Sequence, residues 1–123
     1  MQKLKSSEIA PVRNSLLSTQ NGKCAVCSGP CSATLARLDH CHTTGAVRGT
    51  LCNGCNALLG KVENNAPRFG VRNLSAFLHG AAAYLQKHMT NITGLIHPLH
   101  LTEDEKRIKR NTKARATRAA KKL

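Results

Sequence analysis

The stretch that decides the fold, residues 24–56, reads CAVCSGPCSATLARLDHCHTTGAVRGTLCNGCN. It opens with one Cys-x-x-Cys pair and closes with a second, and the segment between them is longer than the roughly 15–20 residues usual in zinc ribbons. Thiolates in two such pairs suit a tetrahedral zinc ion. The candidate zinc ligands are Cys24, Cys27, Cys52 and Cys55. The longer intervening segment has room for a hairpin, and this hairpin carries the ionisable residues.

The segment between the cysteine pairs predicts a strand, a turn, a second strand and a helix. Residues 34–40 alternate loosely and residues 46–51 form a second extended run. Between them, Gly45 supplies the positive φ of a turn. A helix should open at the second cysteine pair, with Asn53 as its cap and Leu58, Leu59 and Val62 on its apolar side. Zinc would then join the base of the hairpin to the start of this helix.

In this arrangement two polar residues of the first strand can face the first turn of the helix. Asp39 and His40 fall at the end of the first strand, and Asn56 directly follows the last zinc cysteine. A carboxylate and an amide oxygen are ligands that Mg²⁺ accepts, together with water and phosphate. The unperturbed pKa of a histidine, about 6.5, suits a general base at neutral pH.

These residues form a longer pattern: Leu38-Asp39-His40-x-His42, then Gly45-x-Val47-Arg48-Gly49-x-Leu51-Cys52-x-x-Cys55-Asn56, then Leu59-Gly60. The pattern resembles the phage recombination endonuclease VII family, which belongs to the HNH (ββα-metal, His-Me finger) nucleases. The resemblance covers about residues 22–62. Cys41 departs from it, since relatives often carry an acidic residue there, and its role in assisting the metal is open.

The resemblance implies a role for each matching residue. Asp39 and Asn56 would hold one catalytic Mg²⁺ or Mn²⁺, and His40 would be the general base that takes a proton from water. His42 would contact the scissile phosphate or pass a proton. Separately from the resemblance, the place of Arg48 on the second strand would let it contact the DNA backbone. Spacing alone shows only that these residues can converge. A zinc-ribbon module that binds nucleic acid without catalysis is the alternative interpretation.

Composition favours a polyanionic partner. The chain has 123 residues and a formal net charge of +13, with 19 Lys and Arg against 6 Asp and Glu. Such an excess of basic charge favours nucleic acid. No apolar run approaches the roughly 20 residues of a membrane-spanning helix, and residues 1–10 do not form a signal peptide. The paired cysteines therefore indicate zinc in a reducing cytoplasm rather than disulfides. The family resemblance implies that this is the cytoplasm of a phage-infected bacterium.

The flanking segments divide the chain into four parts. Residues 1–22 are a lead-in with a short helix over about 12–19, expected to pack on the hairpin, and residues 23–64 are the nuclease core. Residues 65–100 hold a loop, an amphipathic helix over 73–88 expected to cover the hairpin core, and a connector. His97 and His100 in the connector are weak candidates for metal binding. Residues 101–123 are a basic helix or tail.

The last part combines a helix start with a run of basic residues. Thr102 to Glu105 is a capping-box pattern with acidic residues where the helix dipole favours them. Such a stretch, with almost no apolar stripe, should be partly disordered alone and should order against phosphates. The basic residues expected to bind DNA phosphates are Lys106, Arg107, Lys109, Arg110, Lys113, Arg115 and Arg118.

The sequence thus predicts an α+β fold: a zinc-stapled ββα-metal core with flanking helices and a basic C-terminal helix. The expected function is a metal-dependent DNA endonuclease that uses one catalytic metal. Nicking, homing-type cleavage and cleavage of branched DNA all stay open. Paired incisions in a branched substrate would need a homodimer, whereas a nickase could act as a monomer.

Overall fold

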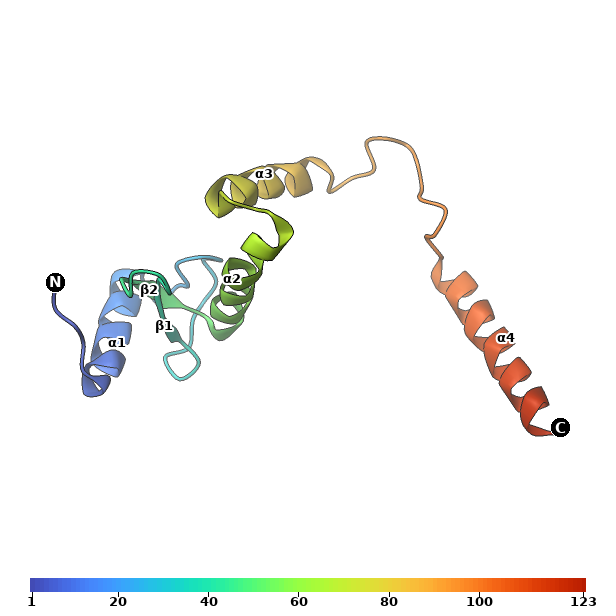
Figure 1. Cartoon of the computed structure of the whole chain (residues 1–123), viewed down its shortest axis with the longest axis horizontal. Coiled ribbons are helices and arrows are strands. Elements are labelled where there is room, and N and C mark those ends of the chain that lie inside the picture. The colour runs from blue at the N-terminus through green and yellow to red at the C-terminus, as the bar shows by residue number, and fades with distance from the viewer. The chain divides into compact units, whose positions relative to one another are not determined.

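The computed structural model describes residues 1–123 and contains a two-stranded sheet with helices before and after it (Figure 1). The chain separates into two units, Met1–His79 and Gly80–Leu123, and each is described below by itself. The mixed helix and sheet composition confirms the α+β class at this coarse level.

The sheet is an antiparallel hairpin of β1 (Arg37–His40) and β2 (Val47–Leu51). The connecting turn is closed by hydrogen bonds from the Gly45 N–H to the Cys41 carbonyl (2.7 Å) and from the Cys41 N–H to the Ala46 carbonyl (2.9 Å). Gly45 has a φ of 76°, which confirms its expected role in the turn. The first strand starts later than residue 34 because the Ser32 carbonyl accepts the N–H groups of Leu35 and Ala36, which makes a turn there.

Helix α1 (Ile9–Thr19) follows a short 3-10 helix η1 (Ser6–Glu8) and packs on the hairpin, as expected (Figure 1). It is longer than predicted because Pro11 falls in its first turn, where a missing N–H costs nothing. The chain leaves the helix through Asn21 and Gly22, both with positive φ.

Polar contacts join the end of α1 to the middle of β2. The Gln20 side-chain amide donates to the Thr50 carbonyl (2.8 Å) and accepts from the Thr50 N–H (3.0 Å). The Thr50 hydroxyl donates to the Arg13 carbonyl at 2.7 Å, and Thr50 is fully buried. Gly49 lies close to the same amide: a Cβ there would stand 3.3 Å from Gln20 Oε1. These contacts fix β2 against α1 through hydrogen bonds rather than through a large apolar surface.

Helix α2 (Asn53–Asn65) begins directly after β2. The prediction that Asn53 caps this helix is wrong. The capping position is Cys52, whose backbone is extended, and its side chain makes no capping hydrogen bond. The extended backbone of Cys52 suits a residue that links the end of a strand to the start of a helix. Its thiol lies with those of three other cysteines, described below. α2 also runs three residues into residues 63–72, the segment expected to be a loop, and the 3-10 helix η2 (Ala66–Phe69) follows it.

The buried core is small and lies around the hairpin. Its apolar members are Leu17, Cys24, Ala36, Leu51 and Ala66. Helix α3 (Leu74–Lys87) matches the predicted amphipathic helix in its bounds, but none of its residues is buried. The expectation that it covers the hairpin core therefore finds no support in the burial of its side chains. With so little apolar burial, a metal staple is a plausible source of stability for the hairpin.

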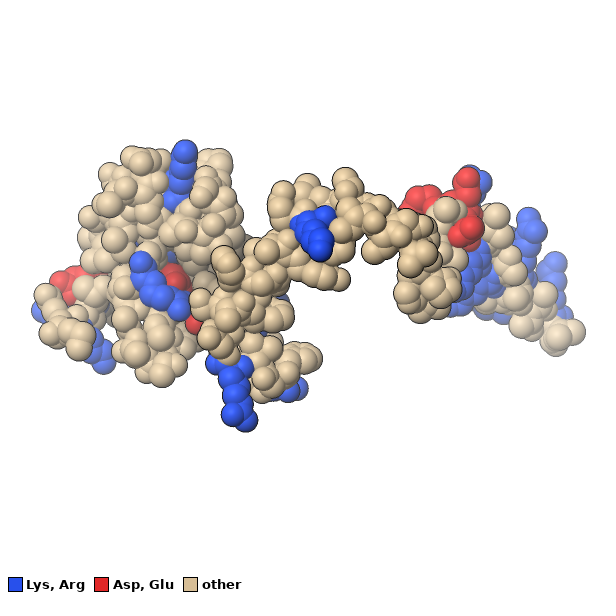
Figure 2. All heavy atoms as spheres, turned by 90° about the horizontal axis from the view of Figure 1, so that it is seen from above, with Lys and Arg blue, Asp and Glu red and all other residues tan.

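The second unit ends in helix α4 (Glu103–Lys121), which has no buried residue. The capping box is confirmed: Thr102 accepts the Glu105 N–H, and the Glu105 carboxylate accepts the Thr102 N–H. Lysine and arginine side chains line the helix beyond its acidic first turn (Figure 2). No helix of the chain combines the length and the apolar character that crossing a membrane requires.

Candidate metal and nuclease site

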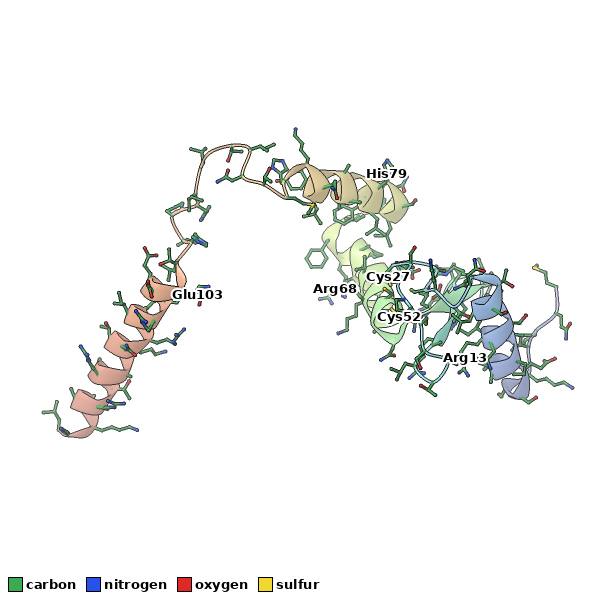
Figure 3. The ribbon with its side chains drawn as sticks, turned by 180° about the vertical axis from the view of Figure 1, so that it is seen from behind. Arg13, Cys27, Cys52, Arg68, His79 and Glu103 are labelled. Atoms are coloured by element: carbon green, nitrogen blue, oxygen red, sulfur yellow. The ribbon has the colours of Figure 1, made fainter.

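The four cysteines predicted to bind zinc lie together. Their Sγ atoms are all within 4.8 Å of one another, and Sγ of Cys27 is 3.9 Å from Sγ of Cys52 (Figure 3). A tetrahedral zinc ion with Zn–S bonds of about 2.3 Å places its sulfur ligands about 3.8 Å apart. The cluster is therefore fit to hold zinc. The cluster includes neither Cys41 nor His42, so neither residue replaces one of the four paired cysteines.

Backbone groups around the cluster favour negative sulfur. The N–H of Val26 points to Cys24 Sγ (3.5 Å), and the N–H of Gly29 points to Cys27 Sγ (3.4 Å). Burial raises the pKa of Cys24, but hydrogen bonds from the backbone of Cys27, Cys52 and Val26 outweigh burial and lower this pKa to about 6. Hydrogen bonds with the side chains of Cys52 and Cys27 raise the pKa of Cys55 to about 12. The sulfurs thus hold their protons unequally, and a dication would compensate four thiolates together.

All six cysteines are free thiols. Burial, followed by the charges of Cys24 and Cys52, raises the pKa of Cys31, which stands outside the cluster of four. Cys41 lies in the hairpin turn, where hydrogen bonds from Thr44 and Thr43 lower its pKa. His97 and His100, in the second unit, are exposed and belong to no group of potential metal ligands.

The hairpin positions the predicted catalytic residues. Asp39 and His40 are the last two residues of β1, as expected. Asp39 is buried and His40 is exposed. His42 follows in the turn, and its ring centroid is 4.9 Å from that of His40. The two imidazoles are therefore neighbours at the turn end of the hairpin.

Asn56 lies in the first turn of α2, where its N–H donates to the Cys52 carbonyl (3.0 Å). It is half-buried, and its helix contacts β1. The second cysteine pair thus starts the helix that carries Asn56, while the hairpin that carries Asp39 ends at the same cysteines. No hydrogen bond joins the side chains of Asp39 and Asn56.

A β-bulge places Arg48 at the site. Asp39 pairs with Gly49 and His40 pairs with Val47, so Arg48 has no partner on β1. Bulges of this kind redirect one side chain and recur beside active sites. Arg48 donates to Asp39 through Nε (2.7 Å) and Nη2 (3.0 Å). The predicted DNA-contacting residue is therefore bound to the predicted metal ligand.

Glu63, which sequence reasoning passed over, completes this group. Its carboxylate accepts from Nη1 (3.1 Å) and Nη2 (2.9 Å) of Arg48. These bonds lower the pKa of Glu63. The hydrogen bonds of Arg48 with Asp39, followed by those with Glu63, raise the pKa of Arg48. A signal for Glu63 was present in the sequence: it stands seven residues after Asn56, two helical turns along the same face.

A polar hollow of about 220 Å³ adjoins this group at the hairpin turn. His42, Thr43 and Glu63 line it from the site, and Arg72 lines it from the segment before α3. The other predicted DNA contacts, from Lys106 to Arg118, all lie on α4 in the second unit and are exposed. Of these, Lys106, Lys109, Arg110 and Lys113 share one face of α4.

The class of the protein follows from a family match rather than from the fold alone. Residues 2–87 match the model of the recombination endonuclease VII family, and the chain belongs to this family. Membership makes the protein a nuclease, an enzyme that acts on phosphodiester bonds of DNA. The match includes α1, the hairpin, α2 and α3, and it ends before α4.

Proposed function

We propose that the protein is a DNA endonuclease of the HNH, ββα-metal type. The observation that carries this proposal is the placement of Asp39 on β1 and Asn56 in the first turn of α2, in a chain of a nuclease family. The cysteine cluster lies at the junction of β2 and α2, and β1 pairs with β2, so both residues sit on a braced scaffold. Sites built on strands and helices hold catalytic geometry better than sites on loops do.

The residues fit a single hard divalent cation. Asp39 offers carboxylate oxygens and Asn56 an amide oxygen, which suit Mg²⁺ or Mn²⁺ with water and phosphate as further ligands. When bound, such an ion would relieve charge on the scissile phosphate and on the leaving 3′ oxygen. Asp39 already balances a cation in this structure, the Arg48 guanidinium, which supports its role as the anionic centre of the site.

The histidines would handle protons and phosphate. His40 is exposed at the end of β1, where it can take a proton from an attacking water. His42 lies next to it and lines the polar hollow, in reach of a phosphate at the hairpin turn. Arg48 would contact the DNA backbone through the edge of its guanidinium that Asp39 now occupies.

We further propose that the cysteine cluster binds one structural zinc and that α4 anchors DNA. Because the buried core is small, the energy of zinc binding would stabilise the hairpin directly. The exposed basic face of α4 would contact phosphates without reading bases, since no aromatic or Gln side chain accompanies it and its one Asn lies outside that face. Nicking of duplex, homing-type cleavage and cleavage of branched DNA are the candidate activities.

The second candidate function is a zinc module that binds nucleic acid without cleaving it, which the Arg48–Asp39 pairing favours because it occupies both Asp39 oxygens. A cleavage panel separates the two. Supercoiled plasmid, linear duplex, a four-way junction and single strands are each incubated with Mg²⁺, Mn²⁺ or EDTA, and zinc content is measured after each incubation. We expect cleavage with Mg²⁺ or Mn²⁺ and none with EDTA. Binding without cleavage under all conditions would establish the zinc module instead.

A further inference from the structure

Arg48 lies between two carboxylates and presents a different edge to each. Its Nε and Nη2 atoms donate to Asp39, and its Nη1 and Nη2 atoms donate to Glu63. The side chain of Asp39 is only 10% exposed, against 25% for Glu63 and 35% for Arg48. A guanidinium that bonds carboxylates along two edges is held in a defined orientation. Arg48 is therefore fixed at the site and does not sample solvent freely.

The contacts with Asp39 conflict with metal binding. Both carboxylate oxygens of Asp39 accept hydrogen bonds from Arg48, so a divalent cation must displace the guanidinium from at least one of them. The Arg48 guanidinium and a divalent cation bound to Asp39 would also repel each other. If Arg48 had no second partner, its release from Asp39 would leave a partly buried charge unpaired, and metal binding would carry that cost.

The contacts with Glu63 remove this conflict. The bond from Nη1 to Glu63 involves no atom that touches Asp39, so it persists when Asp39 lets go. The edge that is then released, Nε with Nη2, has the spacing that recognises two phosphate oxygens.

We propose that Glu63 is a positioning residue that retains Arg48 when Asp39 exchanges the guanidinium for the catalytic metal. Glu63 thereby keeps the phosphate-binding edge of Arg48 at the site and lowers the competition that the metal meets at Asp39. This inference rests on the proposed metal site at Asp39, and its test separates the two.

The test measures Mn²⁺ binding to the full-length, zinc-loaded protein without DNA, by electron paramagnetic resonance of free Mn²⁺. The variants are Arg48→Met, Glu63→Gln, their combination, and Asp39→Asn. A neighbouring opposite charge changes the proton affinity of a carboxylate by about 10- to 1000-fold. Because this site is partly exposed, we expect the change in metal affinity to lie at the low end of that range. Arg48→Met should tighten Mn²⁺ binding by about tenfold, and Glu63→Gln should weaken it several-fold.

The combined variant distinguishes the two roles that Glu63 could have, holding Arg48 or binding the metal itself. If Glu63 acts by holding Arg48, the combination should bind Mn²⁺ as Arg48→Met does. If Glu63→Gln weakens binding equally with and without Arg48, Glu63 is itself a metal ligand and the inference is wrong. Unchanged binding in Glu63→Gln also overturns it. Wild-type binding in Asp39→Asn would instead remove the metal site and with it the proposed function.

Controls keep the result independent of folding. Zinc content and the thermal midpoint are measured for each variant. Glu63→Asp, which keeps the charge on a shorter stem, should restore part of the wild-type affinity and serves as a second reading if Glu63→Gln folds poorly. Mn²⁺ binding by Glu63→Asp that is as weak as by a folded Glu63→Gln would contradict a role for the carboxylate's charge.

Discussion

The hairpin and helix α4 are both basic parts of one chain, but they are built in opposite ways. The hairpin is tied to its neighbours by long-range hydrogen bonds, a cysteine cluster and two ion pairs. Helix α4 has local stabilisation only: a capping box and ion pairs between residues three apart. The residues proposed for catalysis, which need a fixed geometry, thus lie on the cross-linked hairpin. Attraction between charges needs no such geometry, so a locally stabilised helix such as α4 is sufficient for it.

The largest effect should follow from breaking the cysteine cluster. We expect Cys52→Ser to lose zinc and unfold the hairpin, because metal-binding energy is folding energy in such sites. Hydrogen exchange should rise in residues 24–56 and stay unchanged in α4. Cys31→Ser is the matched control, since Cys31 lies outside the cluster. Active wild-type protein that contains no zinc on elemental analysis would contradict the zinc assignment.

Loss of the proposed base should remove chemistry while leaving structure intact. We expect His40→Ala to reduce the cleavage rate by at least ~100-fold, the lower end for general-base catalysis, with zinc content and DNA binding unchanged. His79→Ala, on the exposed surface of α3, is the control and should cleave normally. A normal rate in His40→Ala would reassign the base, with His42 as the next candidate because its ring is adjacent.

A smaller effect should follow from loosening β2 from α1. Gln20→Ala removes the side-chain bonds to the Thr50 backbone and leaves the part-buried Thr50 N–H without its partner, while the Thr50 carbonyl keeps its bond from the Ala25 N–H (3.2 Å). We expect the free energy of unfolding to fall by about 1–3 kcal/mol. Chemical denaturation measures this, with Gln86→Ala on exposed α3 as the control. Equal stability of the two variants would show that the Gln20 bonds do not stabilise the hairpin.

The smallest effect on the fold should come from removing residues 103–123. This deletes α4 except for its cap, and the melting of the first unit should not change, since α4 buries nothing. DNA binding should weaken alike for unrelated sequences, and the salt dependence should flatten by about 0.9 in log–log slope per lost phosphate contact. Affinity against salt is measured on two duplexes and one junction. An unchanged slope, or a loss confined to one substrate, would show that α4 is not a general phosphate anchor.

Local signals in the sequence predicted most of the elements, and long-range signals were harder to interpret. Cysteine spacing predicted the cluster, Gly45 predicted the turn, and Thr102 with Glu105 predicted the start of α4. The exact start of β1 was missed because a Ser32 turn competes with the strand.

The Arg48 group could not be derived in the same way. Arg48 reaches Asp39 only because a bulge removes its pairing partner, and a bulge depends on how the strands register. Glu63 bonds to Arg48 from α2, so this contact depends on how α2 packs against the hairpin. Sequence periodicity indicates which residues share a face of one element, but it does not give the contacts between elements.

The Gln20 amide has a consequence for how this protein avoids sticking to itself. A two-stranded sheet has unpaired backbone groups on both outer borders, which invite a strand from another molecule. Gln20 occupies one such border by imitating a peptide group: it offers a donor and an acceptor to the same residue, Thr50. One side chain thus stands in for a third strand at this border, where it blocks a strand of another molecule from pairing with Thr50.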